Sequence, residues 1–209
     1  MALSGFFLLF FLLQHLTINL LSLCSEDTFN SVSHFMGYNA IVQYILQPVL
    51  IFGVLFHLIM GMYLEYQNTK ARNKKYAKHN SGASSSWMSR NMLITGITIL
   101  LFLGLHFYDF WIAEINYKYV VGLPEDPTRY FAEVQHKFVD IWRVAIYVVS
   151  FMFLSLHLMH GFQSAFQSVG FRHNKYTPII KKLGMAYAIL VPLGFIIIAV
   201  YHHICISHT

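Results

Sequence analysis

Charged residues are scarce in this chain: only 11% of its 209 residues are Asp, Glu, Lys or Arg, whereas 56% are hydrophobic. A soluble domain is about one quarter charged, so this composition excludes an ordinary soluble enzyme and indicates a membrane protein. Apolar runs of about 20 residues mark membrane-spanning helices. We expect five of them, at about residues 2–24, 39–66, 91–113, 139–167 and 183–205. They leave no room for a soluble catalytic domain, so we treat residues 1–209 as one all-α transmembrane domain.

Acidic residues are missing from two of the loops between these runs. The loop after the second run and the loop after the fourth carry basic side chains only. These basic residues are Lys70, Arg72, Lys74, Lys75, Lys78 and Arg90, then Arg172, Lys175, Lys181 and Lys182. Short loops rich in Lys and Arg stay in the cytoplasm, so we expect a cytoplasmic N-terminus and an outer C-terminus. The net charge of +5 is then a signal of topology, and nucleic acid is not expected as a partner.

Cysteine is nearly absent as well. Cys24 and Cys205 match no zinc or c-type haem spacing, and we interpret both as small apolar residues rather than as a disulfide. The first apolar run lacks a basic start and a small-residue cleavage site, so we interpret it as a helix and not as a signal peptide. Basic residues normally anchor such a helix in the cytoplasm, and their absence here leaves room for a missing upstream stretch.

An internal repeat relates the first two expected helices to the next two. In SGFFLLFFLLQH and TGITILLFLGLH a glycine precedes a histidine by ten residues, which relates His15 to His106. In HLIMG and HLMHG a histidine precedes a glycine by four residues, which relates His57 to His157. Because the two halves run in the same direction, equivalent residues face each other across a pseudo-two-fold axis along the membrane normal.

The depths of these histidines give the same pairs. At about 1.5 Å of rise per residue, His57 and His157 lie about 12 and 15 Å from the cytoplasmic helix ends, and His15 and His106 about 20 and 24 Å. We call His57 and His157 the inner pair and His15 and His106 the outer pair. An imidazole at membrane depth is costly to bury and usually has a function.

Paired imidazoles at two depths favour haem over other metal groups. Neutral imidazole binds iron, copper, zinc and nickel, but a pair is too small for a closed tetrahedral zinc site. A haem brings four nitrogens and needs only two axial ligands. Gly61 and Gly161, one turn from the inner histidines, leave room for a porphyrin face, although close helix packing is the competing use of such glycines. The hypothesis is two b-type haems between the first four helices, stacked through the membrane.

Other histidines fit this pattern less well. His160 lies three residues from His157 on nearly the same face and is an alternative ligand, but the second helix has Met60 at the equivalent position. We therefore place His160 near a haem edge. His202 and His203 lie at the outer end of the fifth run without a partner of matching depth, and we expect them at the membrane interface.

Three charged residues lie near the outer boundary of the membrane. For Asp109, Asp140 and Arg143 the simplest interpretation is a solvated helix end. An acid beside the outer haem could instead serve a quinone headgroup, and the sequence leaves this choice open. In the outer loop 114–138, Pro127 followed by residues 128–137 predicts a short helix along the interface.

Four stretches carry a family resemblance: MALSGFFLLFFLLQHL, FHLIMG, SSSWMSRNMLITG leading to LFLGLHFYDFW, and SLHLMHGFQSAFQSVG. With these, covering most of the chain, the sequence resembles the di-haem cytochrome b subunit of succinate dehydrogenase or fumarate reductase, the five-helix anchor of bacterial complex II. The resemblance implies axial ligands at His15, His57, His106 and His157, the first paired with the third and the second with the fourth. Family members usually carry a basic cytoplasmic stretch before the position of Met1.

The resemblance also implies partners and a location. A flavoprotein subunit and an iron–sulfur subunit would dock on the basic cytoplasmic face, in the inner membrane of a bacterium. Electrons would pass between the iron–sulfur subunit, the two haem b groups and a quinone, often menaquinone. The chain itself would belong to an oxidoreductase without touching succinate. The direction in vivo and a dimer of the complex stay open.

Three alternatives remain at this point. One is the di-haem anchor of another respiratory complex, such as a hydrogenase or a formate dehydrogenase. Another is a proton-coupled transporter that uses histidines as a relay; it would bind no pigment and would not need histidines paired by depth. The third is a structural anchor that has lost its haems, which four retained histidines argue against.

Overall fold

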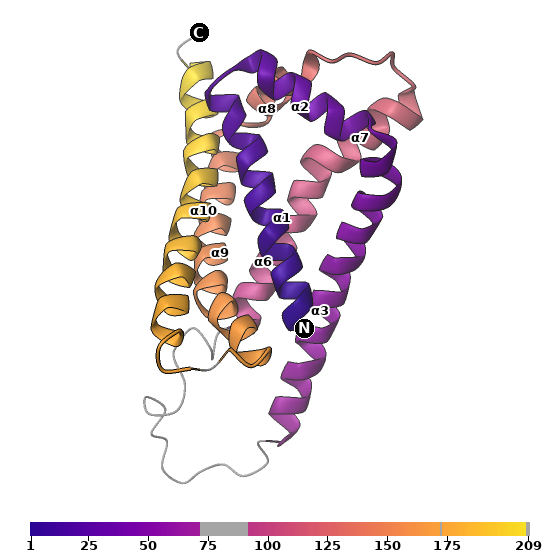
Figure 1. Cartoon of the computed structure of the whole chain (residues 1–209). Coiled ribbons are helices and arrows are strands. Elements are labelled where there is room, and N and C mark those ends of the chain that lie inside the picture. The colour runs from indigo at the N-terminus through magenta and orange to yellow at the C-terminus, as the bar shows by residue number, and fades with distance from the viewer. Residues whose placement is uncertain (72–91, 172, 208–209) are drawn as a thin grey trace.

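The computed structural model describes residues 1–71, 92–171 and 173–207 of the chain, and these residues form helices and connecting turns without strands. Five helical segments are long and apolar enough to cross a membrane: Ala2–Leu23, Val42–Lys70, Met92–Val121, Ile141–Ser168 and Thr177–Cys205. The expected all-α bundle of five transmembrane helices is therefore confirmed. Because the number of crossings is odd, α1 begins and α10 ends at opposite ends of the bundle (Figure 1).

The described α-helices are α1 (Ala2–Leu20), α2 (Glu26–Tyr38), α3 (Gln47–Ala71), α6 (Met92–His106), α7 (Ala113–Ile115), α8 (Arg129–Lys137), α9 (Ile141–Ser168) and α10 (Thr177–Ser207). Shorter helical stretches extend them: a 3-10 turn at Leu21–Leu23 and π-helical stretches at Val42–Leu46, Phe107–Ile112 and Asn116–Val121. The short helix predicted after Pro127 is confirmed as α8.

The connection between the first two transmembrane segments is itself a helix, α2. It lies beside α8 across one end of the bundle (Figure 1). We call this end the α2/α8 end. Ser25 caps it, because its Oγ accepts a hydrogen bond from the backbone N–H of Thr28 (3.2 Å). At the other end Asn39 is extended, and its Oδ1 accepts from the backbone of Ile41 (3.0 Å) and Val42 (3.2 Å). The second segment therefore starts at Val42 rather than at residue 39.

The third segment is longer than its apolar run. It continues from Met92 to Val121 instead of ending near residue 113, and Gly122 ends it with a left-handed backbone (φ 68°) that glycine adopts freely. Glu114 and Lys118 give this region the composition of a loop, but they are four residues apart and pair at 2.6 Å on the helix. The fifth segment likewise begins at Thr177 rather than at residue 183.

The buried core joins α1, α9 and α10. Its apolar side chains include Leu16, Val144, Tyr147, Phe151, Val191, Phe195, Ile198 and Ala199. In the most apolar 18-residue stretch of the fifth segment, 39% of the residues are buried. In the corresponding stretch of the second segment, no residue is buried. Many large apolar side chains elsewhere point outward, such as Leu3, Leu101 and Trp142. Such a surface suits lipid, because a water-soluble monomer rarely exposes apolar patches of this extent.

The contact between α9 and α10 predicts a sensitive position at Gly184. A methyl group added there would lie 2.7 Å from Cδ1 of Phe162, whereas nothing described lies within 4 Å of one added at Gly104. We expect Gly184→Ala to lower the free energy of unfolding by about 1–3 kcal/mol, the cost typical of overpacking. The matched control Gly104→Ala should leave it unchanged or raise it. Thermal unfolding in detergent measures both variants, and equal midpoints would contradict the packing described.

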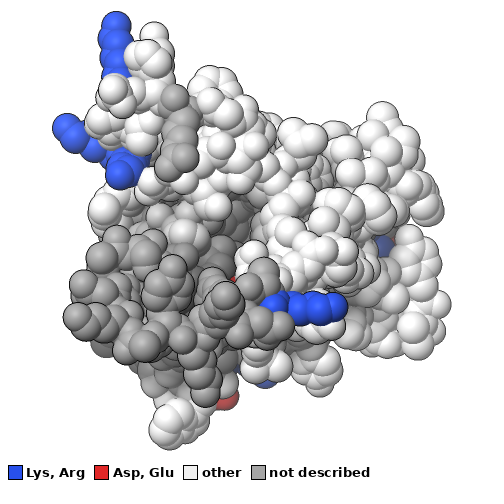
Figure 2. Space-filling model, turned by 90° about the horizontal axis from the view of Figure 1, so that it is seen from below, with Lys and Arg blue, Asp and Glu red and all other residues white. Residues whose placement is uncertain are grey.

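The end of the bundle opposite the α2/α8 end carries basic side chains. The described lysines near it are Lys70 at the end of α3, Lys175 before α10, and Lys181 and Lys182 in the first turns of α10. Seen from this end, Lys and Arg atoms stand out and few Asp or Glu atoms are visible (Figure 2). The other basic residues expected there, Arg72, Lys74, Lys75, Lys78, Arg90 and Arg172, lie outside the described residues.

Candidate functional site

The structure brings the outer pair together. His15 on α1 and His106 at the end of α6 have ring centroids 5.8 Å apart, with their planes at 89°. A metal–imidazole bond is about 2 Å long, so two histidines on opposite sides of one metal ion have centroids about 6 Å apart. At this spacing the two imidazoles would have room to hold one metal ion between them.

Aromatic side chains surround the outer pair. Phe11 stacks on His15 at 5.4 Å, Phe195 lies 5.7 Å from the same ring, and Phe110 lies 5.1 Å from His106. Nδ1 of His106 is buried and makes no hydrogen bond among the described residues. Buried polar atoms are nearly always hydrogen-bonded. The described residues therefore give no reason for a buried nitrogen here. Apolar walls and imidazole donors suit a flat macrocycle with iron.

The inner pair lies against hydroxyl groups of neighbouring helices. Ser4 Oγ on α1 is 3.1 Å from Nδ1 of His57 on α3, and Thr95 Oγ1 on α6 is 3.2 Å from Nδ1 of His157 on α9. Ser4 and Thr95 occupy the same place in the internal repeat, each directly before its repeated glycine. The repeat seen in the sequence therefore recurs as matching contacts between helices.

Glycines show the same correspondence. A methyl group added at Gly5 would lie 3.9 Å from Cε1 of His57, and one added at Gly96 would lie 3.8 Å from Cε1 of His157. The glycines one turn after the inner histidines also match: added methyl groups at Gly61 and Gly161 would lie 3.3 and 3.5 Å from the Cε atoms of Met1 and Met92. The end of a flexible methionine therefore lies over each glycine for which the sequence suggested room beside a porphyrin.

Contacts also place three further histidines, His160, His202 and His203. His160 is half-buried on α9, and it is His157 that contacts the hydroxyl of Thr95. His202 is buried between helices, at 0% exposed, with Nε2 2.9 Å from Ser22 Oγ. Nδ1 of His203 lies 2.9 Å from the backbone oxygen of Phe138.

Asp109 is not a solvated helix end. Its side chain is 0% exposed and accepts hydrogen bonds from Arg143 Nη1 (2.8 Å) and from the Tyr147 hydroxyl (2.8 Å), both on α9. The Tyr147 ring lies 6.3 Å from that of His106, so this cluster adjoins the outer pair. Asp140 does follow the simpler interpretation, because it caps α9 by accepting from the backbone of Trp142 (3.0 Å).

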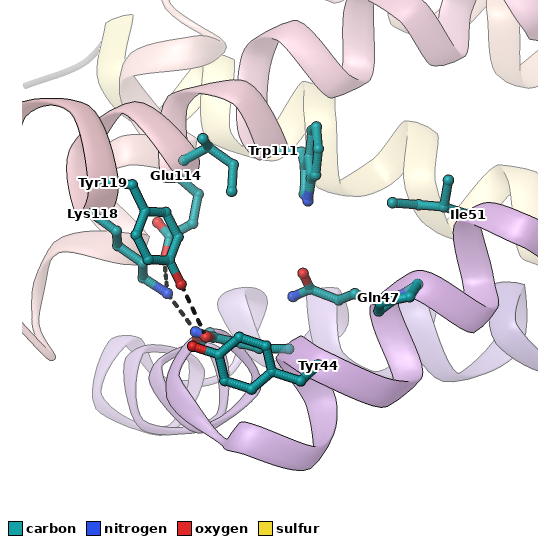
Figure 3. A pocket seen from close by; sticks show the side chains of 11 residues that line it. Tyr44, Gln47, Ile51, Trp111, Glu114, Lys118 and Tyr119 are labelled. Atoms are coloured by element: carbon teal, nitrogen blue, oxygen red, sulfur yellow. Dashed lines mark hydrogen bonds and ion pairs between the residues drawn. The ribbon is translucent and has the colours of Figure 1, made fainter.

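A cavity of about 280 Å³ lies between the start of α3 and the third transmembrane segment. Figure 3 shows the Gln47 amide and the Trp111 indole pointing toward one space, with Glu114 and Lys118 at one side and Ile51 at another. Lys118 pairs with Glu114 at 2.6 Å. In the sequence, this site is marked only by two polar residues, Gln43 and Gln47, within an apolar run. Nothing in the sequence indicates that they lie beside residues 111–119.

Charges beside this cavity are held in place by α8. Arg129 pairs with Glu114 and, at 2.6 Å, with Glu133. Burial alone would lower the pKa of Arg129, but its hydrogen bonds and ion pairs with the two carboxylates outweigh burial and raise the pKa. Burial also raises the pKa of the Tyr130 hydroxyl. Both shifts keep Arg129 charged and the Tyr130 hydroxyl neutral at neutral pH.

The described residues contain no cluster of three or more His, Cys, Asp or Glu that could hold a metal ion. A histidine pair alone cannot complete a tetrahedral zinc site, whereas it supplies all that a haem iron needs from the protein. The donor set, the ring spacing of the outer pair and the apolar walls therefore fit haem. His15, His57, His106 and His157 are the residues that could hold it.

One known protein resembles this chain along part of its length. The chain is 29% identical over 126 residues to the succinate dehydrogenase cytochrome b558 subunit of Bacillus subtilis (strain 168), a match that covers 56% of this chain and 57% of that protein. The chain thus spans about half the length of the curated relative it matches. No family model matches the chain, and no solved structure matches it.

Proposed function

We propose that this chain is the membrane-anchor cytochrome b subunit of a succinate dehydrogenase or fumarate reductase. The repeated histidine pairs carry the proposal, together with the similarity to the cytochrome b558 subunit. His15 and His106 would hold one haem b, and His57 and His157 the other. When bound, the haems supply one-electron transfer, and the protein holds them at two depths among apolar helices.

The basic end of the bundle is the proposed docking face for the partner subunits. The positive-inside rule places this end in the cytoplasm, and Lys70, Lys175, Lys181 and Lys182 would meet the flavoprotein and iron–sulfur subunits there. The location would be the inner membrane of a bacterium, with the N-terminus cytoplasmic. The haems held by the inner and outer pairs would supply the one-electron chemistry that links the iron–sulfur subunit to a quinone.

The two depths give this transfer an electrical component. One electron that crosses the whole membrane exchanges about 2.3 kcal/mol per 100 mV of membrane potential. A transfer from the inner to the outer pair covers part of that distance.

The cavity near Trp111 is the proposed headgroup site for the quinone. It lies beyond His106 along the third segment, toward the α2/α8 end. Gln47, Trp111 and Lys118 line it with hydrogen-bond donors, and a quinone carbonyl needs such donors. Asp109 is a poorer candidate, because it is fully buried and already accepts from Arg143 and Tyr147.

Reduction of the purified protein by candidate donors tests the proposed function. A tagged chain would be purified with its partners from native membranes, and the haem absorption followed after adding succinate, menaquinol, hydrogen or formate. We expect b-type bands that reduce with succinate and with menaquinol, and co-purification of a flavoprotein. Reduction by hydrogen or formate alone would assign the chain to another respiratory complex. Protein without pigment would favour the histidine-relay transporter.

A further inference from the structure

The inner pair is held by two hydroxyl groups that each have a second acceptor. Ser4 Oγ lies 2.7 Å from the backbone oxygen of Met1 and 3.1 Å from Nδ1 of His57. The backbone oxygen also accepts from the N–H of Gly5 at 3.0 Å, so it belongs to the first turn of α1.

The other half of the repeat has the same arrangement. Thr95 Oγ1 lies 3.0 Å from the backbone oxygen of Met92 and 3.2 Å from Nδ1 of His157. Thr95 is 2% exposed, so water does not compete for its hydroxyl. Two independent helix pairs therefore build the same chain of imidazole, hydroxyl and carbonyl.

The direction of the hydrogen bonds follows from counting protons. A hydroxyl has one hydrogen to donate, and a carbonyl oxygen can only accept. In both chains the oxygen–oxygen distance is shorter than the distance to the imidazole. The hydroxyl hydrogen therefore points to the carbonyl, and the hydroxyl oxygen is left to accept a hydrogen bond from Nδ1–H.

We propose that Ser4 and Thr95 are positioning residues that hold His57 and His157 as the Nδ1–H tautomer and leave the lone pair of each Nε2 for iron. The inference rests on the proposed function, since it names how this chain prepares two of the proposed haem ligands. The nitrogen that binds a metal ion is set by the hydrogen bond of the other nitrogen. A partner that accepts from a ligating histidine also raises the basicity of the ligand.

Two comparisons within the chain show what is particular to these hydroxyls. Thr17 and Thr98 also donate to backbone oxygens, at 2.9 and 3.0 Å. Thr17 is exposed and Thr98 is half-buried, and neither contacts a histidine in the described hydrogen bonds. In the outer pair, Nδ1 of His106 has no hydrogen-bond partner among the described residues. Loss of the hydroxyls should therefore act on the inner haem alone.

The test compares hydroxyl deletions with matched controls in the haem-loaded protein. Ser4→Ala and Thr95→Val remove the hydroxyls, Thr95→Ser keeps one, and Thr17→Val and Thr98→Val remove equivalent hydroxyls that face no histidine. Potentiometric titration of the haem absorption gives the midpoint potential of each haem. A less basic ligand stabilises ferric iron less, so we expect the inner potential to rise in each deletion and further in the double variant.

The outer potential, Thr95→Ser and both controls should match the wild type. Haem affinity at the inner site should fall by about 10–100-fold, as is typical when the partner of a metal ligand is lost. Equal shifts of both potentials, or no shift in Ser4→Ala and Thr95→Val, would overturn the inference. If Thr95→Val does not assemble, Ser4→Ala alone tests the inference, because it removes a single oxygen in the first turn of α1. A wild type without haem would overturn the proposed function instead.

Discussion

His106→Ala will lower the haem content from two b haems per chain to one. The variant removes one of the two imidazoles whose rings lie 5.8 Å apart, and the proposed haem would keep a single protein ligand. His57→Ala should also remove one haem, but the other one. A pyridine haemochrome assay on purified protein, normalised to chain concentration, gives the count.

Double variants test the pairing itself. Loss of both His15 and His106 should still leave one haem, since both are proposed ligands of the same haem. Loss of both His57 and His106 should leave none. His160→Ala is the matched control on α9 and should retain two haems. The proposed pairs are wrong if the His15 and His106 double variant loses both haems, or if His160→Ala loses one while His157→Ala loses none.

Arg143→Leu will destabilise the protein more than any packing change described above. Asp109 is fully buried and would keep only the hydrogen bond from Tyr147. Removal of one partner from a buried ion pair costs about 3–5 kcal/mol, because the other charge is left without compensation. We expect a loss of this size in the free energy of unfolding, measured in detergent micelles.

The double variant Asp109→Asn with Arg143→Leu should recover much of that loss, because no uncompensated charge then remains. Glu125→Gln is the control for an exposed pair: Glu125 is 56% exposed and 2.7 Å from His34, and such pairs contribute about 0–1 kcal/mol. If Arg143→Leu were no more harmful than Glu125→Gln, the ion pair would contribute little to stability.

The sequence alone predicts those features that depend on residues within one helix. Long apolar runs predicted five transmembrane segments, and the interval between Gly5 and His15 recurs between Gly96 and His106. The sequence predicted the ends of these segments less well. The third segment continues past residue 113 because Glu114 and Lys118 pair along the helix, whereas in the sequence two charges resemble a loop.

Contacts between distant segments could not be read from the sequence. Asp109 is neutralised by Arg143, which comes from another helix, and the buried His202 contacts Ser22, which lies 180 residues away in the sequence. Neither partner is marked by spacing. Ser4 and Thr95 are an intermediate case. Each directly precedes its repeated glycine, so the repeat marks them as equivalent positions. Only the structure shows that they contact His57 and His157.

A dithionite-reduced minus oxidised absorption spectrum of the purified wild-type protein, with a pyridine haemochrome count, tests the central claim most directly. Two b-type haems per chain are the predicted result, because the proposed ligands form two pairs, His15 with His106 and His57 with His157. A chain without haem would contradict the cytochrome assignment.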